Sequence, residues 1–382
     1  MLRKIIVIGP AYPLRGGIAA FTERLSDELF KQGNDVSIET YSLQYPKFLF
    51  PGKTQLSTEE NTSKVPIQVS LNSINPFNWI RMGKRLKKAK PDIVIFKYWI
   101  PFMAPALGTL ARIIKKNKAT KCIALAHNIL PHEKRIGDRR LSKYFIKAMD
   151  GFLVLSESVK KDLESFNFKK PVRISSHPLY DHFGELLKRE EALRILQLDT
   201  DYNYLLFFGF IREYKGLDLA LKALASTKLK DLKLKLIVAG EFYSEAKSYH
   251  DLVNKLSISD RVIFHSDFIS DSLVPAYFSA ADLIVQPYKD ATQSGVTQIA
   301  YHFNKPILVT NVGGLPELVP HKKAGYVSSL DTEEIASYIL DFFKEKREKE
   351  FSANIFDLKK KYSWKLFVER FNELITDIES FK

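Results

Sequence analysis

Apolar and polar positions follow two alternating patterns along the chain. Short runs of apolar, often β-branched residues alternate with longer stretches in which apolar residues recur every three or four positions. The first pattern predicts buried strands and the second predicts amphipathic helices. In the first half of the chain, the predicted strands are residues 4–8, 35–41, 92–98, 121–126 and 151–155. Helical patterns lie between several of them, for example at 18–32 and 141–149.

The second half of the chain repeats this scheme. Its predicted strands are residues 204–209, 235–239, 261–265, 283–286, 306–309 and 325–327. Predicted helices between them include 217–225 and 274–280. Continuous apolar strands followed by helices are typical of a parallel sheet that is covered on both faces. The sequence therefore predicts an α/β protein with two doubly wound, Rossmann-like domains.

A polar, proline-containing segment around Ser175 and Pro178 separates the two halves. We expect the first domain at residues 1–176 and the second at 177–362. The last helical stretch has an apolar stripe, so we expect residues 363–382 to pack back on the first domain. Ligands bind at the carboxyl ends of the strands in open α/β sheets, so two facing sheets would form a central cleft.

Charge is distributed very unevenly between the halves. Residues 1–180 contain 31 Lys and Arg against 14 Asp and Glu, a net charge of +17, whereas residues 181–382 carry −3. The basic residues cluster at 81–88, 115–118 and 134–147. Such clusters suggest an anionic partner, and lipid headgroups, a phosphate-bearing acceptor and nucleic acid all fit the charge. The chain shows no nucleic-acid-binding signature, so we expect no nucleic acid and favour an anionic membrane surface.

Cysteine content and hydropathy limit the cellular context. The single cysteine, Cys122, excludes a disulfide framework and fits a reducing compartment, so we expect a cytoplasmic protein. The longest apolar stretch, 93–114, is interrupted by Lys97 and Arg112 and therefore predicts strand, loop and helix rather than a membrane span. With the basic first half, this suggests attachment to the inner face of the plasma membrane. We expect no metal ion and no resident cofactor.

The stretch from Gln286 to Val319 carries the clearest candidate chemistry. Ser294 and Gly295 open a helix after a buried strand, which presents free backbone N–H groups and the positive end of the helix dipole to a phosphate. A Gly-Gly turn at 313–314 follows the next strand, so two backbone-rich loops are expected at one sheet edge. Glu317 is expected to cap or open the helix after this turn.

Three further loops follow predicted strands. Gly209, Arg212 and Lys215 lie at and after the end of the first strand of the second domain. An Arg and a Lys three residues apart, just before a helix, can both reach a phosphate. The loop after the first strand of the chain has a Gly pair at its helix start, Gly16 and Gly17, but it is not GxGxxG and supports no dinucleotide site. His127 and Asn128 end another strand of the first domain, where a histidine is placed to meet a ligand.

These motifs, in this order, resemble the nucleotide-sugar-dependent, retaining glycosyltransferases of GT-B fold, and most of all the group called family 4. The resemblance rests on the segments MLRKIIVIGPAYPLRGG, LAHNILPHE, FFGFIREYKGLDLALKAL, SGVTQIAYHFNKPILVTNVGGLPELV and YSWKLFVERF, and it covers essentially the whole chain. It implies that the first domain binds the acceptor and the second binds the nucleoside-diphosphate sugar.

Site residues carry over from the family by position. Arg212 and Lys215 would contact the diphosphate and, with His127 near the transferred sugar, form the catalytic group. The resemblance implies that residues at the helix start around Gly295 contact the donor and that residues of the first domain contact the acceptor. The implied donor residues are Gly209, Gln293, Ser294, Gly295, Val296, Gln298 and Glu317, and the acceptor-side residues are Gly16, Gly17 and Asn128.

The chain departs from the family at two conserved features of its motif. The family commonly has two glutamates eight positions apart, and ungapped counting places Ala291 and Ile299 there. A shift of one residue places Gln298 near the ribose, and Gln293 could reach sugar hydroxyls. The family's arginine usually lies two residues earlier, where this chain has Phe210.

The sequence therefore predicts a retaining glycosyltransferase of the hexosyltransferase type. Its donor would be a UDP- or GDP-sugar, its acceptor a saccharide or lipid-linked molecule, and its context the synthesis of cell-surface polysaccharide or glycolipid. Two alternatives remain open at this point: a nucleotide-sugar epimerase on the same fold, and a non-catalytic binding subunit that uses the basic first half.

Overall fold

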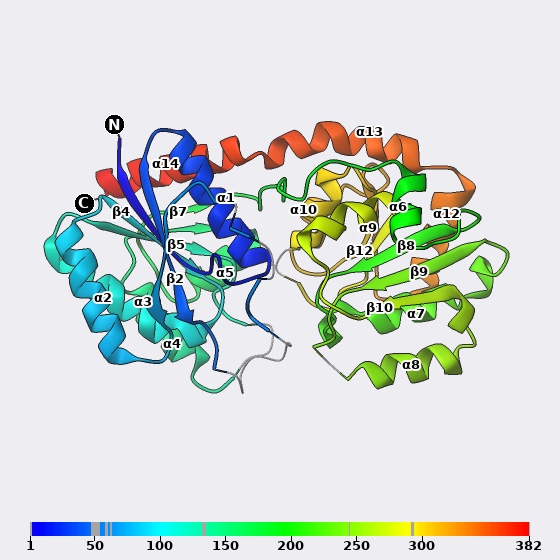
Figure 1. The fold of residues 1–382 in the computed structure, drawn as a ribbon, viewed down its shortest axis with the longest axis horizontal. Helices are drawn as coiled ribbons and strands as arrows, with labels where there is room; N and C mark the ends of the chain where they lie inside the picture. The colour runs from blue at the N-terminus through cyan, green and yellow to red at the C-terminus, as the bar shows by residue number, and fades with distance from the viewer. Residues whose placement is uncertain are drawn as a thin grey trace. The chain divides into compact units, whose positions relative to one another are not determined.

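A computed structural model describes residues 2–46, 54–57, 60–61, 63–131, 135–243, 245–291 and 294–381. The chain divides into two compact units. Unit 1 comprises residues 1–177 together with 363–382, and unit 2 comprises residues 178–362. The predicted boundary between residues 176 and 177 differs from this division by one residue. Each unit is built around its own parallel sheet (Figure 1).

The sheet of unit 1 has seven strands in the order β3-β2-β1-β4-β5-β6-β7. All neighbours pair in parallel. Strand order reverses direction between β1 and β4, which are adjacent in the sheet. The strands are β1 (Lys4–Ile8), β2 (Asp35–Leu43), β3 (Ile67–Asn72), β4 (Ile93–Tyr98), β5 (Lys121–Ala126), β6 (Gly151–Val154) and β7 (Val172–Ile174).

Helices cover both faces of this sheet. On one face, α2, α3, α4 and α5 contribute apolar residues to a single core with the strands. The remaining two helices, α1 and α14, pack against each other, and α14 also contacts β6 and β7 (Figure 1). The helices are α1 (Gly17–Lys31), α2 (Pro76–Ala89), α3 (Ala104–Ile114), α4 (Asp138–Ile146), α5 (Glu157–Glu164) and α14 (Trp364–Ser380).

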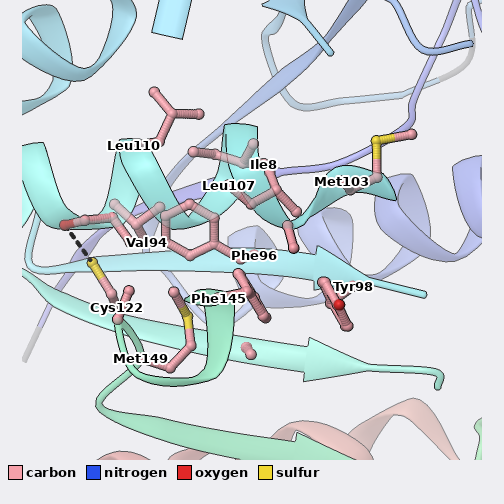
Figure 2. Packing of buried hydrophobic residues seen from close by; sticks show 14 of the residues in the cluster. Ile8, Val94, Phe96, Tyr98, Met103, Leu107, Leu110, Cys122, Phe145 and Met149 are labelled. Atoms are coloured by element: carbon pink, nitrogen blue, oxygen red, sulfur yellow. Dashed lines mark hydrogen bonds between the residues drawn. The ribbon is translucent and has the colours of Figure 1, made fainter. Parts of the chain in front are cut away.

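The core of unit 1 forms where α3 lies over the centre of the sheet. Figure 2 shows Leu107 and Leu110 of α3 above Val94 and Phe96 of β4. Nearby, the ring of Phe145 from α4 stacks on that of Tyr98, with centroids 4.2 Å apart. Burial of such side chains stabilises the unit by roughly 1.5–3 kcal/mol each. The sheet is therefore a rigid base from which the loops at its carboxyl edge project.

The sheet of unit 2 has six strands in the order β10-β9-β8-β11-β12-β13, again all parallel. Its direction reverses between β8 and β11. The strands are β8 (Asn203–Phe208), β9 (Leu234–Ala239), β10 (Val262–His265), β11 (Leu283–Gln286), β12 (Ile307–Thr310) and β13 (Gly325–Ser328).

Helices again complete the unit. Residues of α7, α8, α12 and α13 share one apolar core with the strands. A second group, α6 and α9, pack against each other, and α9 contacts β8. The helices are α6 (Arg189–Ile195), α7 (Leu217–Leu224), α8 (Ala246–Lys255), α9 (Val274–Ala280), α10 (Gly295–His302), α11 (Leu315–Leu318), α12 (Thr332–Lys344) and α13 (Glu348–Leu358).

Two parallel, helix-covered sheets confirm the predicted fold class. All predicted strands are present, with ends shifted by at most two residues, but β3 and β7 were not predicted. Both are edge strands with largely half-exposed or exposed residues, so neither shows a continuous apolar run. The helix predicted at 141–149 was misplaced. It begins at Asp138 because Gly137, with a φ of 98°, forms its N-cap.

Candidate functional site

The point where strand order reverses in unit 2 gathers the predicted donor residues. The strands β8 and β11 are neighbours there, and their following loops leave the sheet toward opposite sides. Ligands of open α/β sheets bind at such a point, outside the carboxyl ends of the strands. The loop after β8 carries Gly209, Arg212 and Lys215, and the segment after β11 leads to Ser294 and Gly295.

Gly209 allows the loop after β8 to approach the start of α10. Its φ is 92°, a conformation that favours glycine. A Cβ placed on Gly209 would lie 3.3 Å from Nζ of Lys215 and 3.7 Å from Cγ2 of Val296. The structure therefore brings together three residues that the sequence assigned to donor binding: Gly209, Lys215 and Val296.

Arg212 is the N-cap of a short helical turn in this loop, Glu213–Lys215, and Lys215 is its last residue. The guanidinium carbon of Arg212 lies 5.1 Å from the ring centroid of Tyr243, and Nζ of Lys215 lies 5.6 Å from that of Tyr288. Loss of hydration lowers the pKa of Lys215 to about 7, and the positive charge of Arg212 contributes to the shift. In the described part of the chain, neither cation forms an ion pair with a carboxylate. Two adjacent cations without an acidic partner are suited to an anionic ligand.

Among the described residues, no side chain caps the backbone N–H groups at the start of α10. Ser294 is the N-cap residue, but its side chain makes no capping hydrogen bond. Instead, Oγ of Ser294 accepts from Nε2 of Gln286 at 3.0 Å, while Oγ1 of Thr297 donates to Oε1 of Gln286 at 2.8 Å. This buried network fixes the loop and leaves the first N–H groups of the helix for another acceptor. It is absent from the sequence prediction, because a buried glutamine at a strand end has no distinctive pattern.

Two glycines show how closely the neighbouring loops pack. A Cβ on Gly295 would lie 2.8 Å from the ring of Tyr180. Gly313 has a φ of 52°, and a Cβ there would lie 1.4 Å from the carbonyl oxygen of Ala291. The loops after β11 and β12 therefore meet at one edge, as the sequence predicted.

The remaining predicted donor residues have mixed outcomes. Gln298 is fully buried, and neither atom of its amide has a hydrogen-bond partner among the described residues. Ile299 and Ala291, which stand where the family has glutamates, are also buried. Glu317 is exposed in the first turn of α11, whose N-cap is Gly314, so of the two predicted alternatives it helps to open this helix and does not cap it. Gln293 lies outside the described residues.

The acceptor-side residues lie at the carboxyl edge of unit 1. Gly16 is the N-cap of α1 with a φ of 104°, and no atom of the described residues comes within 4 Å of a Cβ placed there. Gly17 is the first residue of the helix, which has no acidic side chain in its first turn. An open, glycine-rich helix start of this kind can approach a ligand closely.

His127 follows β5 directly, and its backbone N–H donates to the carbonyl of Tyr98 at 2.8 Å. Asn128 comes next in the same loop and is half-buried. The ring of His127 is buried against Phe21, with centroids 5.1 Å apart, and lies 6.1 Å from the ring of His177. Burial lowers the pKa of His127 well below its usual range, and the charges of Lys97 and His177 add to this shift. His127 is therefore a neutral base at pH 7.

Sequence reasoning missed Lys97 in this cluster. Its Nζ lies 3.5 Å from the ring centroid of Phe21, the side chain is fully buried, and Nζ has no hydrogen-bond partner in the part of the chain described. Burial lowers its pKa well below the usual range. In the sequence, Lys97 only interrupts an apolar run. Lys97 lies next to Gly9, and both residues are at the carboxyl ends of adjacent strands. This position could have indicated Lys97 as a candidate site residue.

These sites offer two cations and a helix start in unit 2 and a buried, neutral imidazole in unit 1. Within the described ranges, no group of three or more His, Cys, Asp and Glu side chains is arranged to hold a metal ion. No helix of the described residues is both long and apolar enough to span a bilayer.

Comparison with known families accounts for nearly all of the chain. Residues 15–178 match the model of Glycosyltransferase Family 4, and residues 188–356 match that of Glycosyl transferases group 1. Among curated proteins, an uncharacterized glycosyltransferase of Methanocaldococcus jannaschii is 23% identical over 376 residues, which cover 95% of this chain and 95% of that protein.

Solved structures show the same fold. Sucrose-phosphate synthase from Thermosynechococcus elongatus superposes with a TM-score of 0.74 at 15% identity, covering 99% of this chain and 100% of that one. HepE from Anabaena, solved in complex with UDP and glucose, gives a TM-score of 0.74 at 16% identity, covering 98% of this chain and 99% of its own. Neither the epimerase nor the non-catalytic subunit is favoured by these matches.

Proposed function

The chain belongs to the family 4-like glycosyltransferases of GT-B fold, and we propose that it transfers a hexosyl group from a nucleoside-diphosphate sugar to an acceptor hydroxyl with retention of anomeric configuration. The observation that carries the donor assignment is the grouping of Arg212, Lys215 and the uncapped start of α10 where strand order reverses in unit 2. UDP and UDP-glucose are bound by Anabaena HepE, which supports a donor of this class.

The proposed reaction breaks the bond between the sugar's anomeric carbon and the diphosphate oxygen. Negative charge grows on the diphosphate as this bond breaks, and stabilising that charge is the main catalytic task. Arg212 and Lys215 supply two positive charges, and the N–H groups near Gly295 supply fixed dipoles. The acceptor hydroxyl forms the new bond on the same face, and its proton passes to the departing phosphate oxygen.

This route uses no carboxylate nucleophile. The positions where the family has glutamates hold Ala291 and Ile299, both buried and apolar. A neutral His127 can accept a hydrogen bond from a sugar hydroxyl or donate one to it. Because it carries no charge, it does not repel a positively charged sugar in the transition state. The proposal needs no resident cofactor, because the nucleotide sugar is itself a substrate.

We propose that the first domain binds the acceptor through Gly16, Gly17 and Asn128, and that the acceptor is a saccharide or a lipid-linked molecule. Synthesis of cell-surface polysaccharide or glycolipid at the inner face of the plasma membrane is the context that the basic unit 1 supports. Contact with an anionic membrane would bring a lipid-linked acceptor to the enzyme.

Sugar transfer across a panel of UDP- and GDP-sugars tests the proposal. We expect turnover with at least one donor, and the anomeric proton coupling of the product, measured by NMR, to match that of the donor. The double variant Arg212→Ala/Lys215→Ala should lose about 100-fold or more in kcat/KM, the scale of one lost transition-state contact.

A matched control variant removes the same two positive charges from positions outside the proposed site. Arg194 and Lys255 are exposed residues of unit 2, and Arg194→Ala/Lys255→Ala should retain normal turnover. Equal losses in the two double variants would remove the phosphate assignment. Conversion of donor without any acceptor would instead identify an epimerase, and inversion at the anomeric carbon would refute retention alone.

A further inference from the structure

The three basic clusters of the sequence come together on one layer of unit 1. The first lies on α2, the second on the short helix η3 (Lys115–Asn117) that follows α3, and the third on α4. In the structure, α3 contacts both α2 and α4, and η3 contacts α2, so these elements are neighbours (Figure 1). Segments that are distant in sequence therefore bring the three basic clusters onto neighbouring elements of unit 1.

Helix α2 presents one exposed stripe in this layer. Phe77, Ile80, Arg81, Lys84 and Lys88 follow the spacing of a single helical face, and all five are exposed. The side chain of Phe77 is 84% exposed and that of Ile80 is 41% exposed. Neither side chain belongs to the core of unit 1, to which α2 contributes Met82 and Leu86 from its opposite face.

The orientation of α2 is fixed by that opposite face. Met82, Gly83 and Leu86 are buried, and a Cβ on Gly83 would lie 3.0 Å from the side chain of Ile113 in α3. Close packing of two helices at a glycine leaves little freedom for α2 to rotate. The exposed stripe is therefore a permanent feature of the surface.

Arg81, Lys84 and Lys88 of this stripe have no acidic partner among the described residues. Residues 61–91 contain no Asp or Glu. Among the cations of α2, Arg85 pairs with Glu39 at 2.7 Å, whereas no ion pair involves Arg81, Lys84 or Lys88 within the described residues. The charge is therefore available to an anionic surface.

We propose that α2 is an interfacial anchor that docks unit 1 on an anionic lipid surface, with Phe77 and Ile80 inserted at the boundary between headgroups and acyl chains and Arg81, Lys84 and Lys88 on lipid phosphates. Amphipathic helices that lie in a membrane interface combine these two features. A nucleic-acid backbone would use the cations but would leave the two apolar side chains exposed to water, so the stripe favours lipid.

This inference names the surface for the membrane attachment in the proposed function, and it does not depend on sugar transfer. Co-sedimentation of the full-length protein with vesicles of equimolar phosphatidylglycerol and phosphatidylcholine tests it. We expect binding to these vesicles and not to pure phosphatidylcholine. The variant Arg81→Gln/Lys84→Gln/Lys88→Gln should reduce partitioning by about fivefold per removed charge, and Phe77→Ser/Ile80→Ser by about tenfold or more.

Unit 2 supplies controls that match these changes. The triple variant Arg194→Gln/Lys230→Gln/Lys255→Gln removes the same net charge from exposed positions. The double variant Leu330→Ser/Phe356→Ser removes exposed apolar side chains, which are 45% and 54% exposed. Both controls should bind vesicles like the unaltered protein. If a control variant loses as much binding as its α2 counterpart, net charge or non-specific hydrophobic adsorption explains the binding and the anchor is refuted.

A probe at residue 77 separates insertion from surface attraction. The only cysteine, Cys122, is fully buried, so Phe77→Cys can be labelled selectively with an environment-sensitive dye. Anionic vesicles should shift its emission to the blue, and the same dye on Leu330→Cys should not respond. An unshifted spectrum, or tighter binding to a 30-base-pair DNA duplex than to vesicles, would overturn the proposal. Transfer to a soluble acceptor should be unchanged in the α2 variants, so failure of the anchor and failure of the enzyme are distinguishable.

Discussion

Two lysines show how differently the two units hold positive charge. Lys97 of unit 1 is fully buried over the ring of Phe21, whereas Lys215 of unit 2 is partly exposed beside Arg212. Burial is the main cause of a lowered pKa at both positions. Both lysines lie near the point where strand order reverses in their sheet, but Lys97 is fully buried whereas Lys215 is partly exposed, so only Lys215 is open to a ligand. The comparison teaches that a lowered lysine pKa marks a binding group only when geometry leaves the amine accessible.

Glycine substitutions should give the largest difference between the two units. Gly313→Ala in unit 2 would force a Cβ into the carbonyl of Ala291, so we expect a loss of about 3 kcal/mol in the free energy of unfolding. Gly16→Ala in unit 1 meets no neighbouring atom and adds only backbone strain, about 1 kcal/mol. Chemical denaturation measures both. Equal losses would mean that the close contact at Gly313 is not maintained in solution.

Removal of Lys97 should stabilise the protein. Lys97→Met keeps an unbranched side chain and removes a buried amine that has no hydrogen-bond partner among the described residues, so we expect a gain of about 2 kcal/mol at pH 7. The folded-state pKa of Lys97 lies below the unfolded value. The unfolded chain therefore holds more protons between these two pKa values, and stability of the unaltered protein rises with pH across that window.

Lys97→Met should abolish the contribution of Lys97 to this pH dependence. It should also raise the pKa of His127, because the charge of Lys97 lowers it. Denaturation at several pH values and NMR titration of the histidine ring measure the two effects. A destabilised variant with an unchanged histidine titration would show that Lys97 and His127 are not coupled.

Lys215 should instead control ligand binding as a function of pH. Its pKa of about 7 in the free protein means that the amine is protonated below pH 7 and increasingly neutral above it. A bound diphosphate favours the protonated form, so UDP affinity should fall about tenfold per pH unit above pH 7. Calorimetry between pH 6 and 9, with Lys215→Met as the comparison, measures this. A variant with the same pH profile as the unaltered protein would contradict the assignment.

The smallest effect is expected from the network at the start of α10. Ser294→Ala removes the acceptor for Nε2 of Gln286, which is buried, and should cost about 1 kcal/mol in the free energy of unfolding. Ser363→Ala removes the capping hydrogen bond of α14 in unit 1 and is the comparison of similar size. If Ser294→Ala were neutral, Gln286 would not fix the loop.

The sequence was sufficient for the two sheets because their inner strands are buried on both faces and therefore appear as continuous apolar runs. The edge strands β3 and β7 lack this pattern, since partners and solvent share their residues. The sequence also placed Arg212 and Lys215 correctly, because they lie between a predicted strand and a predicted helix. Three-dimensional contacts did not: the burial of Lys97 and the approach of Gly313 to Ala291 depend on segments distant in the chain.

The central claim is that Arg212 and Lys215 bind the diphosphate of the donor. Calorimetry with UDP and with uridine tests it most directly, because the two ligands differ only in the diphosphate. We expect UDP to bind the unaltered protein about 100-fold or more tightly than uridine, and Arg212→Ala/Lys215→Ala to reduce this ratio to about tenfold or less without weakening uridine binding. An unchanged ratio in the double variant would contradict the account.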